Sequence, residues 1–222
     1  TIVVTKDNSH YSIGVNSYGQ LGQAWTSPVN DITSMNFQKK VKQISVCETH
    51  SMLVTHDGQV YHLGNNDYYQ NGELSTNRNN TPKLLILNKN LTCEMVSTGE
   101  YYTIFLMKDI VSGKKKLYAA GWSKLGRTGT GKDEETHGFK AISTPDLENV
   151  EFKYVTSSKL SSAAISTTGK LYMWGNNPKG QLGLGHYNDV LEPTLVTFFD
   201  KYEVEDVALS VDHTLVIVKD VE

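Results

Sequence analysis

The feature that most constrains the fold of this chain is an internal repeat of about fifty residues. Four times, a short apolar run ends in a glycine, and another glycine follows eight positions later. The first glycines of the four copies are Gly14, Gly64, Gly121 and Gly175, so the copies are spaced by 50, 57 and 54 residues. Such a period is typical of propellers and solenoids, because each unit buries its apolar face only by stacking on the next.

Each copy has the pattern of antiparallel strands joined by tight turns. A second apolar run precedes each glycine-ending run, and in two copies Asp57-Gly58 or Thr168-Gly169 separates them. A glycine between two apolar runs indicates a hairpin, because glycine supplies the positive φ that the turn needs. A proline follows each glycine block, and we expect it to mark the start of the outer part of the sheet. These prolines are Pro28, Pro82, Pro145 and Pro193.

Helix signals are scarce, so the sequence predicts an all-β propeller of four-stranded antiparallel blades. The chain forms one region, 1–222, with repeats at about 1–50, 51–102, 103–161 and 162–213, and 214–222 begins another. The opening residues Thr1–Asp7 match Thr214–Asp220 in type. We expect these four repeats to be part of a larger propeller, because an unclosed propeller leaves strand edges open. A closed four-bladed ring is the alternative.

The last copy carries the fullest pattern, Gly-Asn-Asn-x-x-Gly-Gln-Leu-Gly-Leu-Gly at 175–185. Together with the His-Ser or His-Thr strands, it resembles the regulator of chromosome condensation repeat, and the resemblance extends over the whole chain. The second copy departs from it with Tyr69 in place of a glycine. The third has Trp122-Ser123 in place of Asn-Asn, and Tyr102 in place of the histidine. The resemblance implies the seven-bladed form.

Proteins of this family include a nucleotide-exchange factor for a Ran-type GTPase, light sensors, ubiquitin-ligase modules and scaffolds. The repeat glycines serve backbone geometry and do not distinguish these functions. A light sensor would need clustered tryptophans, whereas Trp25, Trp122 and Trp174 are scattered along the chain. We therefore expect a non-catalytic platform for protein–protein interaction. The alternative is a guanine-nucleotide exchange factor for a small Ran-type GTPase.

Charge and composition restrict the partners. The net charge of −3 disfavours nucleic acid as the main partner, because phosphate binding needs a basic excess. The apolar runs are too short to cross a bilayer, and the first residues lack the pattern of a signal peptide. Cys47 and Cys93 suggest free thiols in a reducing compartment. We expect a cytoplasmic protein, with the nucleus or a large intracellular assembly as alternatives.

No residue is predicted to be catalytic, to bind a cofactor or to bind a metal. The segment Gly126–Lys132 has the spacing of a phosphate-binding loop, but Asp133 stands where that loop has Ser or Thr. Its glycines also align with those of the fourth copy, so the repeat explains them. His50 and His213 share one repeat position, which favours structural hydrogen bonding over metal binding.

The third copy departs most from the others, and we expect it to carry the partner-binding residues. Its strand pair is lengthened between Asp109 and Leu117, and its later loop, 132–140, is interpreted as an insertion that delays the proline to Pro145. Propeller loops vary while the scaffold stays fixed, so they often carry binding specificity. A tolerated surface insertion is the alternative. The predicted partner-binding residues are Trp122, Lys132, Asp133, Glu134, Glu135, Lys114, Lys115 and Lys116.

Overall fold

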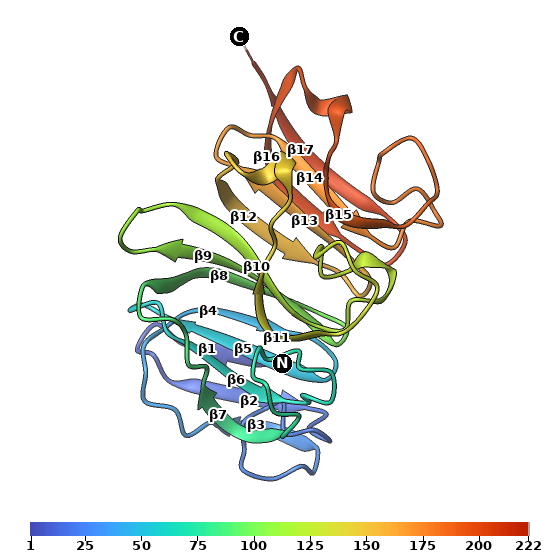
Figure 1. The fold of residues 1–222 in the computed structure, drawn as a ribbon. Coiled ribbons are helices and arrows are strands. Elements are labelled where there is room, and N and C mark those ends of the chain that lie inside the picture. The colour runs from blue at the N-terminus through green and yellow to red at the C-terminus, as the bar shows by residue number, and fades with distance from the viewer. Residues whose placement is uncertain (222) are drawn as a thin grey trace.

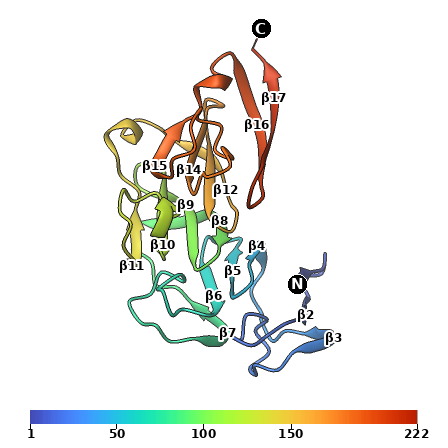
Figure 2. The ribbon, with the colours of Figure 1, turned by 90° about the vertical axis from the view of Figure 1, so that its right-hand side faces the viewer.

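The computed structural model describes residues 1–221, which form five antiparallel sheets arranged along an arc (Figures 1 and 2). The first sheet contains β1 (Ile2–Val4), β2 (His10–Gly14) and β3 (Val29–Ser34). The next three sheets have four strands each, and the last has two. The predicted all-β propeller of four-stranded blades is confirmed.

The four-stranded sheets follow the chain order from strand to neighbouring strand. The first of them contains β4 (Val41–Val46), β5 (His50–Thr55), β6 (Val60–Gly64) and β7 (Asn79–Leu84). The second contains β8 (Leu91–Gly99), β9 (Tyr102–Asp109), β10 (Lys115–Gly121) and β11 (Thr136–Ala141). The third contains β12 (Phe152–Ser157), β13 (Ser161–Ser166), β14 (Leu171–Gly175) and β15 (Val190–Leu195). The two-stranded sheet contains β16 (Tyr202–Leu209) and β17 (Thr214–Asp220).

Three short 3₁₀ helices lie in the connections: η1 (Lys124–Gly126), η2 (Pro145–Leu147) and η3 (Thr197–Phe199). Within residues 1–221, no helix has both the length and the apolar character needed to cross a bilayer.

The sequence repeats and the sheets are offset by one strand. The repeat boundaries near residues 50, 102, 161 and 213 fall at the start of β5, β9, β13 and β17, which are the second strands of their sheets. Each repeat therefore supplies three strands to one sheet and the first strand to the next. Consecutive repeats are joined by backbone hydrogen bonds as well as by packing, which stabilises the order of the sheets.

In each of these sheets, the glycine that ends the strand before the outer strand lies opposite the first residue of the outer strand. The pairs are Gly14 with Val29, Gly64 with Asn79, Gly121 with Thr136, and Gly175 with Val190. The separation is therefore 15 residues in every copy, and the interpretation of 132–140 as an insertion is wrong, because residues 136–141 are the outer strand β11.

The insertion was inferred from the late position of Pro145, which is not equivalent to the other prolines. Pro145 follows β11 and begins η2, whereas Pro82 and Pro193 lie inside β7 and β15. The corresponding residue of β11 is Phe139. Proline is tolerated on an outer strand but not required there, so its position does not fix the loop length. The lengthening between Asp109 and Leu117 is confirmed, as an extended hairpin between β9 and β10.

Apolar cores fill the spaces between neighbouring sheets. In β9, Ile104 and Leu106 pack toward β12–β14, while Phe105 and Met107 pack toward β5 and β6. Alternate residues of a strand point to opposite faces, so a blade with a neighbour on each side is apolar on both. Trp174 is fully buried in the core between the second and third four-stranded sheets.

The antiparallel strands place the connections at two ends of the molecule. The loop face carries the long loops 15–28, 65–78, 122–135 and 176–189, together with the short turns after β4, β8 and β12. The hairpin face carries the turns of the β5–β6, β9–β10 and β13–β14 hairpins. In Figure 1 the loop face lies to the right, and the β9–β10 hairpin points to the left.

Candidate partner-binding face

The long loops are held by one polar side chain near their start. The Asn16 Oδ1 accepts from the Leu21 backbone N–H at 2.8 Å, and its Nδ2 donates to the Trp25 carbonyl at 2.6 Å. Asn66 and Asn177 make the same two kinds of contact in their own loops. Asparagine is suited to this position because one side chain can both accept and donate. The loops are therefore ordered segments of the scaffold.

Ser123 takes this position in the third loop. Its hydroxyl contacts the Thr128 hydroxyl and donates to the Lys132 carbonyl at 2.8 Å. The Asp133 carboxylate accepts from the Leu125 backbone N–H at 2.6 Å. The far side of the loop is therefore tied to its start, and residues 132–133 have a defined position.

The close approach of two backbones positions Trp122. Gly121 has a φ of +110°, and a Cβ at this residue would lie 2.4 Å from the Tyr101 carbonyl oxygen. Only glycine fits such an approach and such a φ. The Trp122 backbone N–H then donates to the same Tyr101 carbonyl at 2.9 Å. The end of β10 is thereby held against the β8–β9 turn.

Three half-buried rings, Tyr68, Tyr101 and Trp122, form what we call the aromatic cluster. Trp122 and Tyr68 are stacked, with centroids 5.2 Å apart and an interplanar angle of 19°. Tyr101 meets Tyr68 at 5.1 Å and Trp122 at 6.1 Å in tilted and edge-on arrangements. The sequence predicted Trp122 but gave no indication of the two tyrosines, which come from separate loops.

Arg127 supports the cluster from inside the protein. Its guanidinium carbon lies 4.5 Å from the Trp122 ring centroid, and the side chain donates to the carbonyls of Lys124 at 2.8 Å and Glu100 at 3.2 Å. The residue is only 2% exposed, and burial lowers its pKa. Arg127 was not among the binding residues predicted from the sequence. The repeat alignment distinguishes Arg127, because the other copies have Gln20, Gln70 and Gln181 at this position.

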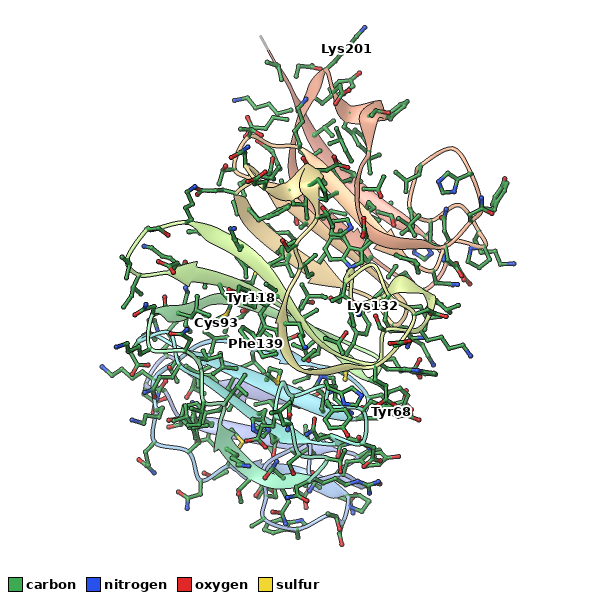
Figure 3. The ribbon with its side chains drawn as sticks, in the orientation of Figure 1. Tyr68, Cys93, Tyr118, Lys132, Phe139 and Lys201 are labelled. Atoms are coloured by element: carbon green, nitrogen blue, oxygen red, sulfur yellow. The ribbon has the colours of Figure 1, made fainter. Side chains whose placement is uncertain are left out.

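The predicted partner-binding residues divide between the two faces. Lys132, Asp133, Glu134 and Glu135 are exposed on the loop face, and Figure 3 shows Lys132 on the same side of the molecule as Tyr68. Lys114, Lys115 and Lys116 lie on and beside the β9–β10 hairpin at the opposite face, where the Lys115 Nζ is 3.6 Å from Glu94. The structure therefore does not bring the two groups together.

Further charged groups lie around the aromatic cluster. Arg78 forms an ion pair with Asp67 at 2.6 Å and lies 4.9 Å from the ring centroid of Tyr18. Glu100, next to Tyr101 in the chain, forms an ion pair with Lys159 at 3.0 Å. The loop face thus combines aromatic rings with charges of both signs.

The loop glycines and His50 have structural roles. Gly126, Gly129 and Gly131 have positive φ in an irregular loop that contains only the three-residue η1, so no long helix faces a phosphate site. His50 is fully buried and hydrogen-bonded, while His213 is exposed. Nowhere in residues 1–221 do three His, Cys, Asp or Glu side chains gather in a way that could hold a metal ion.

Comparison with known proteins agrees with the repeat pattern. The model of the regulator of chromosome condensation (RCC1) repeat matches residues 57–106 and 168–217. The chain is 29% identical to the ultraviolet-B receptor UVR8 of Arabidopsis thaliana, over 97% of this chain and 48% of the receptor. It therefore spans about half the length of this relative.

Solved structures share the fold. Human WBSCR16 superposes with a TM-score of 0.84 and 24% identity, over 99% of this chain and 55% of that one. Prp20p of Saccharomyces cerevisiae, whose structure was described with its binding properties to Gsp1p and histones, superposes with a TM-score of 0.83 and 20% identity. That match covers 100% of this chain and 54% of Prp20p.

Proposed function

We propose that this chain, a β-propeller whose residues 57–106 and 168–217 match the regulator of chromosome condensation repeat, is a non-catalytic platform that binds a protein partner through its loop face. The aromatic cluster of Tyr68, Tyr101 and Trp122 carries the proposal. Tryptophan, tyrosine and arginine are the residues most enriched among those that dominate binding energy at interfaces. Here Tyr68, Tyr101 and Trp122 lie together, half-buried and already in place, and the buried Arg127 contacts the Trp122 ring.

The order of the loops favours binding. Ser123 and Asp133 tie the third loop to itself, and Arg127 fixes the plane of Trp122. A surface that is already ordered loses little conformational entropy when a partner binds. Residues 132–135 supply charged groups on the same face, and we propose that they form the polar rim of the interface.

We propose that Lys114, Lys115 and Lys116 do not belong to that interface, because they lie at the opposite face. We propose that any partner of the basic hairpin is a separate one. We also propose a cytoplasmic location, which fluorescence microscopy of the tagged protein in its own cells would test.

The experiment compares Trp122→Ala with Trp25→Ala. Trp25 lies in the loop 15–28 on the same face and is 47% exposed, but it is not part of the aromatic cluster. We expect affinity capture with the unmodified protein to recover a partner protein. The recovery of that partner should fall at least about tenfold with Trp122→Ala and with Tyr68→Ala, and should stay unchanged with Trp25→Ala. Thermal unfolding shows that each variant is folded. If no captured protein depends on Trp122, the loop face is not the binding surface.

Guanine-nucleotide exchange on a Ran-type GTPase is the second candidate. Its support is the similarity of this whole chain to Prp20p, which was studied with Gsp1p. The measurement is the release rate of fluorescent GDP from a Ran-type GTPase, with and without this protein. Accelerated release that Trp122→Ala abolishes would favour exchange, and an unchanged rate would eliminate this candidate while leaving the binding proposal intact.

A further inference from the structure

The turn between β4 and β5 contains a cysteine and a histidine in direct contact. The Cys47 Sγ lies 3.0 Å from the His50 Nδ1. The His50 Nε2 lies 2.8 Å from the Thr103 Oγ1, and the Thr103 hydroxyl donates to the Gln70 carbonyl at 2.7 Å. Cys47, His50 and Thr103 thus form a relay that ends on a backbone carbonyl.

The relay sets the proton positions. The Thr103 hydroxyl donates its hydrogen bond to the Gln70 carbonyl. The Thr103 oxygen therefore accepts a hydrogen bond from the protonated His50 Nε2. The Nδ1 of a neutral His50 is then free to accept the proton of the Cys47 thiol. A nucleophile beside a base that a third group orients is the arrangement of activated cysteines.

The Cys47 thiol is reachable from solvent through a small cavity of about 190 Å³ on the loop face. Cys47 is half-buried, and the cavity is also lined by Glu48, Thr98, Gly99, Glu100, Ser158 and Lys159. In the same turn, the Thr49 hydroxyl is buried without a hydrogen-bond partner among residues 1–221. The cavity is too small for a large ligand, and its two carboxylates disfavour an anionic reagent.

Cys93 provides an internal contrast. It is fully buried on the side of the hairpin face (Figure 3), and burial raises the pKa of its thiol to about 12. Burial also opposes ionisation of Cys47, but the charge and hydrogen bond of His50, with backbone N–H groups of the turn, lower its pKa to about 7. The charged and titratable groups that face Cys47, besides His50, are Glu48, Glu100, Lys159 and Tyr102.

We propose that Cys47 is a modification site whose thiolate is oxidised to sulfenic acid by hydrogen peroxide, with His50 as the base. The thiolate sulfur attacks one peroxide oxygen, the O–O bond breaks, and an S–OH group forms. The departing hydroxide takes the proton held by His50 and leaves as water, so the imidazolium returns to neutral imidazole. Peroxide is small and uncharged, so it suits this cavity. The cavity lies on the loop face, but this proposal does not depend on a partner binding there.

The first experiment maps alkylation of the native full chain with iodoacetamide by peptide mass spectrometry. We expect Cys47 to react about three to five times faster than free cysteine at pH 7, with a rate that rises through a midpoint near 7. Cys93 is expected to react only after denaturation. A Cys47 rate that titrates near 8.5, or equal labelling of both thiols in the native protein, would overturn the proposal.

The second experiment treats the protein with hydrogen peroxide and traps sulfenic acid with dimedone. We expect a dimedone adduct on the peptide that contains Cys47 and none on the peptide that contains Cys93. His50→Gln removes the base and should move the alkylation midpoint of Cys47 upward. If that variant does not fold, the comparison of Cys47 with Cys93 in the unmodified protein still tests the proposal. Absence of the Cys47 adduct while free glutathione is oxidised would contradict the proposal.

Discussion

Trp122 stacks on Tyr68 across the boundary between two neighbouring sheets, with ring centroids 5.2 Å apart and planes 19° from parallel. Tyr68 belongs to the loop after β6, and Trp122 to the loop after β10. The contact therefore exists only when the two blades are packed together. Aromatic stacking adds about 0.5–1.5 kcal/mol beyond the buried area. The packing of the two blades therefore forms the candidate binding surface.

Arg127→Gln restores the residue of the other three copies and is expected to lower the free energy of unfolding by about 2 kcal/mol, because it removes a buried cation–π contact and hydrogen bonds to two carbonyls. Urea titration measures this change, and acrylamide quenching should show a more accessible Trp122. Arg78→Gln is the control, because Arg78 also contacts a ring but is exposed. It should cost less than about 1 kcal/mol. Equal costs for the two variants would contradict the supporting role of Arg127.

Gly121→Ala is expected to destabilise the protein by more than about 3 kcal/mol. The added Cβ would lie 2.4 Å from the Tyr101 carbonyl oxygen, and φ is +110°, so contact and backbone strain act together. Gly113→Ala is the matched control, because its φ is +74° but no atom lies within 4 Å. It should cost only about 1–2 kcal/mol. Similar melting temperatures for the two variants would contradict the close approach of β10 to the β8–β9 turn.

His62 is expected to make stability depend on pH. Burial lowers its pKa to about 4, although the nearby Glu73 opposes the shift. Above pH 6.5 the residue is neutral in the folded and the unfolded chain. As the pH falls from 6.5 toward 4, only the unfolded chain takes up the proton, so stability decreases, by at most about 3 kcal/mol.

The test for His62 compares urea unfolding at pH 7.5 and pH 5 for the unmodified protein and for His62→Gln. Besides Glu73, the charged groups that act on His62 are Lys83 and His50. The unmodified protein should lose more stability on acidification than the variant. Identical losses would show that His62 does not carry this pH dependence.

Simultaneous replacement of Lys114, Lys115 and Lys116 by alanine is expected to leave Trp122-dependent partner capture unchanged. The three lysines lie at the hairpin face, and the ion pair of Lys115 with Glu94 is partly exposed, so stability should change by less than about 1 kcal/mol. Capture yields and thermal unfolding measure both effects. A loss of the same partner with this variant would show that the interface is not confined to the loop face.

The sequence determined the repeat and most of its strands. Each apolar run that ends in a repeat glycine is a strand that ends at that glycine, and the strands that begin at His50, Tyr102 and Ser161 are where the apolar runs place them. These features follow from local periodicity and from backbone geometry that only glycine permits. Pro145 misled the prediction because an outer strand does not need a proline, so the spacing from Gly121 to Thr136 was the more reliable guide.

Only the tertiary structure decided which side chains meet. Trp122 could be singled out in the sequence, but its partners Tyr68 and Tyr101 lie in other loops, and the relay of Cys47 and His50 ends on Thr103 in the next sheet. The repeat specifies how one blade folds. How blades pack decides which loop residues touch, since that depends on the long-range geometry of the arc, and no local pattern of residues encodes it.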